Sequence, residues 1–203
     1  MKQRIKVIGI TGGIASGKST IAGMLESLGA DLIDADKICH ELINTKGIAL
    51  EITKRWGNHL QDNSGKIKRD VLAEIVFSDE KEISALNSII HPVAIKQIKS
   101  EIAKLHSDVA TEAIVLDAAL LVESNLVDIC DVVLFVNTEK DRCKTRVQNT
   151  RKWHLDEIEK REKFQGLLPQ KREISDVIIN NNNSKKDTLN QVKDFWSQFI
   201  TKK

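Results

Sequence analysis

The order of apolar and polar positions along the chain predicts strands that alternate with helices. Short apolar runs at residues 6–10, 31–34, 113–116, 132–136 and 177–179 predict five strands. A glycine-rich loop and a helix at residues 18–28 follow the first strand, and Gly29 is a typical helix-ending glycine. A run of four asparagines at residues 180–183 predicts an exposed turn, and a closing amphipathic helix is expected at residues 187–200.

A long helical stretch separates the second strand from the third. From residue 35 to residue 105 apolar residues recur three and four positions apart, and residues 57–68 interrupt this pattern with polar and turn-forming residues. Strands separated by helices predict βαβ crossovers, and therefore an α/β fold with a parallel sheet covered on both faces. Because the stretch is too long for one crossover, we expect an insertion beside the carboxyl ends of the strands, where such sheets bind ligands.

The composition is ordinary for a globular protein, since 41% of the 203 residues are hydrophobic and 30% are charged. A net charge of +2 gives no support for binding to nucleic acid or membranes, and the apolar runs are too short to span a bilayer. Cys39, Cys130 and Cys143 form no close pair, which suits a reducing compartment. Since the strand-like run begins by Ile5, no signal peptide fits, and we expect a cytoplasmic protein.

A phosphate-binding motif follows the first strand. Residues 12–19 (GGIASGKS) match G-x-x-x-x-G-K-[ST] at every defined position, between a predicted strand and a predicted helix. Backbone N–H groups of such a loop surround phosphate oxygens, and the helix N-terminus adds positive charge. Lys18 is expected to reach the β- and γ-phosphates of ATP, and the Ser19 hydroxyl to ligate Mg²⁺. The expected ATP-binding residues are Gly13, Ala15, Ser16, Gly17, Lys18, Ser19 and Thr20.

Aspartates end two of the predicted strands. Asp117 follows the run at residues 113–116, where proteins with such a phosphate loop hold a carboxylate for magnesium. The alternative is that Asp117 caps the next helix. Asp34 and Asp36 follow the second strand, which we expect beside the phosphate loop. A hydroxyl acceptor needs a carboxylate that orients it and accepts its proton, and Asp36 is the better candidate for this base. Asp34 is either a substrate contact or a helix cap.

Four segments resemble the dephospho-coenzyme A kinase family, and the resemblance runs nearly end to end. They are residues 10–20 (ITGGIASGKST), 33–36 (IDAD), 86–92 (LNSIIHP) and 116–123 (LDAALLVE). The resemblance implies a five-stranded sheet of the P-loop nucleoside-monophosphate-kinase type. It also implies phosphorylation of the ribose 3′-hydroxyl of dephospho-coenzyme A by ATP, the final step of coenzyme A biosynthesis. Ala119 stands where the family usually has proline, so the backbone there is expected to be less rigid, and Ala15 replaces a common glycine.

The resemblance further implies a single domain with three parts. These are a core (residues 1–35, 108–138 and 174–203), a helical acceptor-binding insertion (36–107) and a lid (139–173). Asp36 would be the general base, and the insertion would hold the acceptor. Substrate contacts are expected at Asp34, His91, Leu120 and Glu123. For His91 the alternative is a hydrogen-bonded structural role, and for Glu123 it is that of a structural anion.

Basic residues gather after the fourth predicted strand. They are Arg142, Lys144, Arg146, Arg151 and Lys152. Arginine suits a lid because its planar guanidinium pairs two phosphate oxygens, and a closing lid excludes water. Arg146 aligns with a family arginine and is expected to act in catalysis, whereas Arg151 is displaced by one position. The alternative is a solvated charged helix.

Two rival functions are weaker on the same residues. A kinase of this fold acting on a nucleoside monophosphate or a sugar acid is disfavoured by the IDAD and His-Pro segments. The second rival is a nucleotide-dependent switch or binding module without phosphoryl transfer. A GTPase would need an Asn-Lys-x-Asp motif, which the sequence lacks, and a nucleic-acid-binding ATPase would be expected to show a more basic face. Dephospho-coenzyme A is therefore the expected partner, with neither nucleic acid nor membrane, and the sequence gives no oligomeric state.

Overall fold

The computed structural model describes residues 4–106, 111–151 and 168–201. The chain forms two compact units, one of Met1–Asp34 with Glu101–Lys203 and the other of Ala35–Ser100. No helix in these described ranges combines the length and the apolar run that a bilayer crossing requires.

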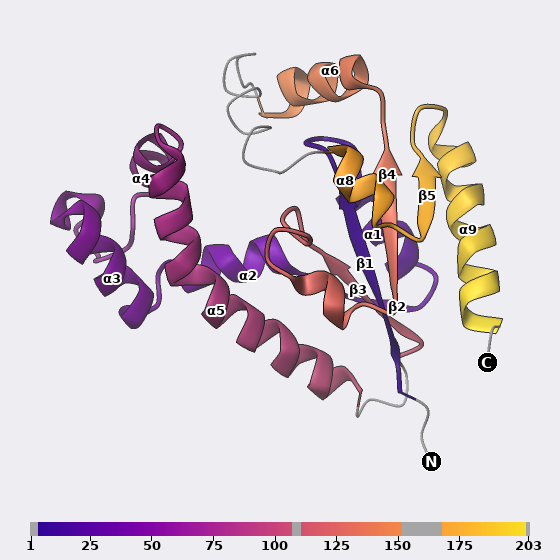
Figure 1. Cartoon of the computed structure of the whole chain (residues 1–203), viewed down its shortest axis with the longest axis horizontal. Coiled ribbons are helices and arrows are strands. Elements are labelled where there is room, and N and C mark those ends of the chain that lie inside the picture. Colours follow the sequence, from indigo (N-terminus) through magenta and orange to yellow (C-terminus); the bar gives the residue numbers. More distant parts are fainter. Residues whose placement is uncertain (1–3, 107–110, 152–167, 202–203) are drawn as a thin grey trace. The chain divides into compact units, whose positions relative to one another are not determined.

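A five-stranded parallel sheet is the centre of the first unit (Figure 1). Its strands are β1 (Lys6–Gly12), β2 (Ala30–Asp34), β3 (Ala113–Asp117), β4 (Val132–Asn137) and β5 (Val177–Asn180), in the order β2-β3-β1-β4-β5. The predicted α/β class and parallel sheet are confirmed. Strands β3, β1 and β4 are buried over nearly their whole length, whereas β2, at one edge of the sheet, is buried only at Ala30 and Ile33.

The expected place of the second strand was wrong. Strand β3 lies between β1 and β2, since Ile10 of β1 and Asp34 of β2 are both register partners of Asp117 in β3. The crossover through the first helix skips one strand position, and no local apolar pattern records such a skip. Asp117 therefore ends the strand beside β1, and Asp34 ends the strand beyond it.

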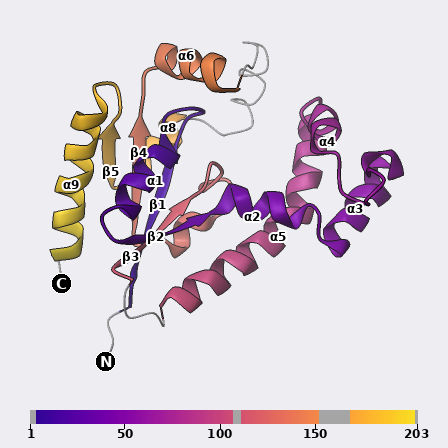
Figure 2. The ribbon, with the colours of Figure 1, turned by 180° about the vertical axis from the view of Figure 1, so that it is seen from behind.

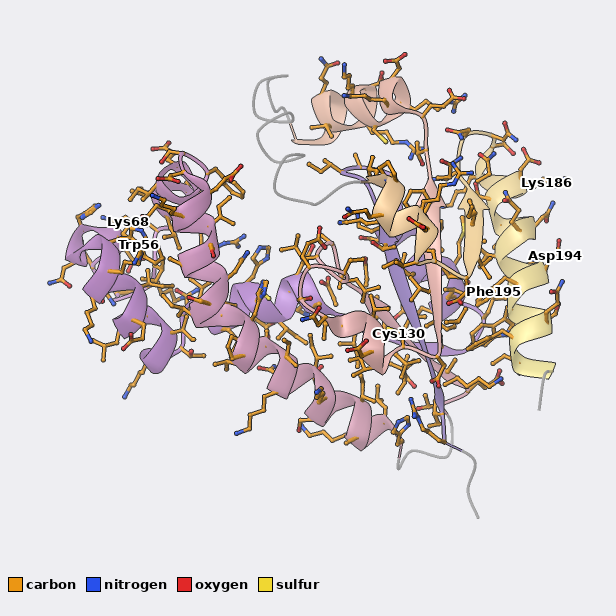
Figure 3. All side chains as sticks on the ribbon, in the orientation of Figure 1. Trp56, Lys68, Cys130, Lys186, Asp194 and Phe195 are labelled. Atoms are coloured by element: carbon orange, nitrogen blue, oxygen red, sulfur yellow. The ribbon has the colours of Figure 1, made fainter. Side chains whose placement is uncertain are left out.

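Helices cover both faces of this sheet. Helices α1 (Lys18–Glu26) and α9 (Lys185–Thr201) pack on one face, and α8 (Leu168–Glu173) lies on the other (Figure 2). Ile21 and Leu25 of α1 and Val192 of α9 are completely buried in the core that they share with the strands. Figure 3 shows the amphipathic character of α9, where Phe195 faces the sheet and Asp194 points away from it.

The second unit is helical, as predicted. It contains α2 (Ala35–Leu42), α3 (Lys46–Trp56), η1 (Asn58–Leu60), α4 (Arg69–Val76) and most of α5 (Glu80–Leu105). Glu82 ties α5 to α3, because its carboxylate accepts hydrogen bonds from Arg55 (3.0 Å) and from Trp56 Nε1 (2.6 Å). These two donors, Arg55 before Trp56, lower the pKa of the Glu82 carboxyl group.

Candidate active site

Residues 12–19 form a loop that leads from β1 into α1. The ammonium group of Lys18 turns back across this loop and donates to the carbonyl oxygens of Gly12 (3.1 Å) and Gly13 (2.9 Å). Gly17 has a φ of 100°, and a Cβ atom there would collide with Nδ2 of Asn181. Only glycine meets both conditions, so the second glycine of the motif is required by conformation and by space.

Ala15 adopts a left-handed backbone conformation with a φ of 54°. In this region the Cβ atom crowds the following carbonyl group, which costs about 1–2 kcal/mol. The motif tolerates any residue here, but the geometry explains why a glycine suits this position better.

Helix α6 (Lys140–Arg151) follows β4 and packs on the phosphate loop. Val147 is completely buried against Ile14, and this contact brings Arg146 to the loop backbone. The Arg146 guanidinium donates to the carbonyl oxygens of Ala15 (3.3 Å), Ser16 (3.1 Å) and Asn181 (3.2 Å). A fixed positive charge therefore lies against the loop. The side chain of Arg151, and Lys152 with the other predicted lid residues to residue 167, lie outside the described parts.

Three predicted site residues of the first unit carry oxygen atoms at or near the ends of their elements, although Asp34 ends a strand that lies one position farther from β1 than expected. Asp117 is 8% exposed at the end of β3, Asp34 is exposed at the end of β2, and Ser19 is exposed in the first turn of α1. Carboxylate and hydroxyl oxygens are hard ligands of the kind that Mg²⁺ prefers, and this ion commonly takes only one or two protein ligands beside phosphates and water. Asp117 and Ser19 fit such a role, although the described residues contain no cluster of three metal-ligating side chains.

The predicted acceptor residues divide between the two units. Leu120 and Glu123 lie in the segment after β3, in the first unit, whereas Asp36 and His91 belong to the second. Asp36 is exposed in the first turn of α2, two residues beyond the end of β2, and His91 is partly buried within α5.

The segment after β3 is anchored by a lysine that the sequence did not single out. Lys171 of α8 is 1% exposed, and its ammonium group lies 2.8 Å from the Glu123 carboxylate and 3.1 Å from the Ala119 carbonyl oxygen. This contact favours the structural alternative for Glu123. Leu121 is completely buried beside Gly9, and thus belongs to the core.

Asn181 is the second residue that sequence reasoning missed. The predicted exposed turn at residues 180–183 was wrong for Asn181, which is 8% exposed and donates from Nδ2 to the Ser16 carbonyl oxygen at 2.7 Å. A buried asparagine cannot be told from its exposed neighbours within a run of four, because its partner is distant in sequence.

A cavity of about 400 Å³ adjoins the phosphate loop in the first unit, a volume within the range of small-molecule sites. Gly13 and Ser16 of the loop form one side, and Lys140 and Arg172 supply positive charge. The remaining lining comes from the end of β4, from α6 and from α8, namely Ile14, Phe135, Val136, Asn137, Thr138, Cys143, Leu168 and Pro169.

A five-stranded parallel sheet in the order β2-β3-β1-β4-β5, whose first strand leads through this loop into a helix, is the fold of the P-loop kinases. The solved shikimate kinase of Acinetobacter baumannii has the same fold, with a TM-score of 0.55 and 16% identity over 98% of this chain and 95% of that one.

A family model described as dephospho-CoA kinase matches residues 6–187. The dephospho-CoA kinase of Fusobacterium nucleatum subsp. nucleatum is 36% identical over 94% of this chain and 97% of its own length. The solved dephospho-CoA kinase from Campylobacter jejuni has a TM-score of 0.66 and 27% identity, and the match covers 99% of this chain and 100% of that one. The chain belongs to the dephospho-CoA kinase family.

Proposed function

We propose that the protein transfers the γ-phosphoryl group of ATP to the ribose 3′-hydroxyl of dephospho-coenzyme A, which gives coenzyme A and ADP. Family membership supports the reaction and the acceptor. The observation that carries the proposal is the phosphate loop, with the cations of Lys18 and Arg146 held against its backbone and Asp117 at the end of the adjacent strand.

Positioning and charge neutralisation supply most of the catalysis in such a transfer. Residues 13 and 15–20 would bind the triphosphate, mainly through backbone N–H groups and the N-terminus of α1. Lys18 has three ammonium protons, so it can keep a loop carbonyl while it donates to a phosphate oxygen. Arg146 would balance the charge that builds up on the transferred group.

Ser19 and Asp117 would hold Mg²⁺, Ser19 through its hydroxyl oxygen and Asp117 through its carboxylate. When bound, the ion would supply positive charge that offsets the charge of the phosphate groups. Asp117 is suited to this role because a mostly buried carboxylate at a strand end is held in place by the sheet.

Asp36 would act as the general base that orients the acceptor hydroxyl and accepts its proton. Its place directly after β2, in the first turn of α2, supports this role, because carboxyl ends of parallel strands are where α/β folds place ligands. Asp34, His91 and Leu120 would contact the acceptor, and Glu123 would support that segment through its ion pair with Lys171. In this scheme residues 36–107 bind the acceptor, residues 139–173 close as a lid, and the remaining residues form the core.

The three cysteines are free thiols, which suits a reducing compartment and supports the proposal of a cytoplasmic location. Neither a nucleic acid nor a membrane is required as a partner.

An ADP-release assay over a panel of acceptors tests the proposal. ADP should form with dephospho-coenzyme A and not with nucleoside monophosphates or shikimate, and mass spectrometry should detect coenzyme A. Turnover with a nucleoside monophosphate but not with dephospho-coenzyme A would show that the proposed acceptor is wrong. ADP release without any acceptor would instead indicate a nucleotide-dependent switch.

A further inference from the structure

Three donors from three separate elements converge on one carbonyl oxygen of the phosphate loop. Ser16 O accepts hydrogen bonds from Thr138 Oγ1 after β4 (2.7 Å), Arg146 Nη1 of α6 (3.1 Å) and Asn181 Nδ2 after β5 (2.7 Å). A carbonyl oxygen has two lone pairs, so two donors would already satisfy its hydrogen-bonding capacity, and here there are three. This concentration indicates a purpose other than solvation of one loop oxygen.

The consequence follows from the planarity of the peptide bond. In a trans peptide the C=O of Ser16 and the N–H of Gly17 point in opposite directions, and the described residues contain no cis peptide. Holding the carbonyl oxygen from outside therefore aims the Gly17 N–H towards the inside of the loop. No described residue accepts a hydrogen bond from this N–H. Donors at the carbonyl end also polarise the amide, which makes its N–H a stronger donor.

We propose that Asn181 is a positioning residue for the nucleotide, whose side-chain amide locks the Ser16–Gly17 peptide with its N–H directed at a phosphate oxygen. The inference rests on the proposed function only in so far as the loop binds a nucleotide phosphate, and not on the identity of the acceptor.

Partners from other elements hold both the side-chain amide and the backbone of Asn181. Its Oδ1 accepts from Thr188 Oγ1 (3.0 Å), and Thr188 is completely buried. Its backbone N–H donates to Asn137 O (2.8 Å), and its backbone carbonyl oxygen accepts from Arg146 Nη2 (3.2 Å). The missing Cβ of Gly17 leaves the space that Nδ2 fills. Asn181 thus joins β4, α6 and α9 to the loop.

Asn181→Asp tests the proposal, since a carboxylate of the same shape has no proton to donate and sets its own lone pairs against Ser16 O. Isothermal titration with ADP and without acceptor should give a Kd at least tenfold weaker than that of the unmodified protein. The KM for ATP should rise similarly, while the KM for dephospho-coenzyme A changes less than twofold. Asn183→Asp is the matched control, because Asn183 belongs to the same run of asparagines and is exposed. Its Kd for ADP should stay within twofold of that of the unmodified protein.

A folded Asn181→Asp protein, judged by circular dichroism and Tm, that binds ADP within twofold of the unmodified protein would overturn the proposal. If that variant does not fold, Thr188→Val decides, because valine cannot donate to Asn181 Oδ1. It should weaken ADP binding threefold to tenfold, and unchanged binding would refute the positioning role. If the unmodified protein binds ADP but does not phosphorylate dephospho-coenzyme A, the proposed function is wrong, whereas this inference still holds.

Discussion

The ammonium group of Lys171 and the carboxylate of Glu123 lie 2.8 Å apart, and they join α8 to the segment that follows β3. The two side chains differ in exposure, since Lys171 is 1% exposed and Glu123 is 23% exposed. Lys171 also donates to the carbonyl oxygen of Ala119. The hydrogen bond restrains the backbone at Ala119, where no proline ring fixes φ.

The difference in exposure predicts unequal effects of breaking this pair. Glu123→Ala leaves a buried ammonium group without its counter-charge, which should cost about 3–5 kcal/mol of unfolding free energy. Lys171→Met leaves a carboxylate that can turn to water, and the loss should be about 1–2 kcal/mol. Urea unfolding measures both. Arg4→Met breaks an exposed pair with Asp131 and should cost less than about 1 kcal/mol; equal losses in the first two variants would contradict the argument.

Local patterns predicted the elements and the motif of this fold. The apolar runs that became β1, β3 and β4 needed no distant information, because buried parallel strands are apolar throughout. The phosphate loop was equally readable, since its chemistry lies within eight consecutive residues.

Features that depend on distant partners could not be predicted. Nothing near residue 31 in sequence indicates that β3 inserts between β1 and β2. Lys171 lies among charged residues, and its partner carbonyl is 52 positions away; Asn181 lies among asparagines, and Ser16 is 165 positions away. Burial of a polar side chain is decided by such tertiary partners.

Asp36→Asn should lower kcat by about two to four powers of ten, because an amide cannot accept the proton of the acceptor hydroxyl. Nucleotide affinity should stay near that of the unmodified protein. Steady-state kinetics and titration with ADP measure the two quantities separately.

Two further variants serve as controls for Asp36→Asn. Glu41→Gln removes one carboxylate from an exposed position of the same helix and should leave kcat within twofold. Lys18→Ala should impair both ATP binding and turnover, since its ammonium group lies within the loop itself. An Asp36→Asn protein that retains most of its activity would show that another group is the base.

Ala15→Gly should stabilise the protein by about 0.5 kcal/mol or somewhat more. The left-handed conformation at a φ of 54° costs alanine about 1–2 kcal/mol, and glycine avoids this cost. The gain is offset in part because glycine makes the unfolded chain more flexible, by about 0.4–1 kcal/mol. Thermal and urea unfolding test the sign. Gly23→Ala is the opposite change within α1, where alanine is the better helix former and the added Cβ atom meets open space, so it should also be stabilising. A loss of stability in Ala15→Gly would show that Ala15 is not strained.

Cys130 predicts a pH dependence of stability above pH 9. Burial, with a smaller contribution from the Asp131 carboxylate, raises the pKa of its thiol from 9.0 to about 12. The thiol packs beside Gly9 and donates to Leu126 O at 3.3 Å, and Cys130 lies next to η2 (Leu126–Ile129) in Figure 3. Between these two pKa values the unfolded chain loses the proton while the folded chain keeps it.

The stabilising contribution of this thiol is therefore complete below pH 9 and falls by about 1.4 kcal/mol for each pH unit above it, towards pH 12. Cys130→Ser keeps a hydroxyl donor that does not titrate in this range. The difference in unfolding free energy between the two proteins should shrink by about 1 kcal/mol from pH 8.5 to pH 10. Lysines titrate equally in both proteins, and the chain has no tyrosine. Parallel pH curves would show that the Cys130 thiol is not desolvated in the folded protein.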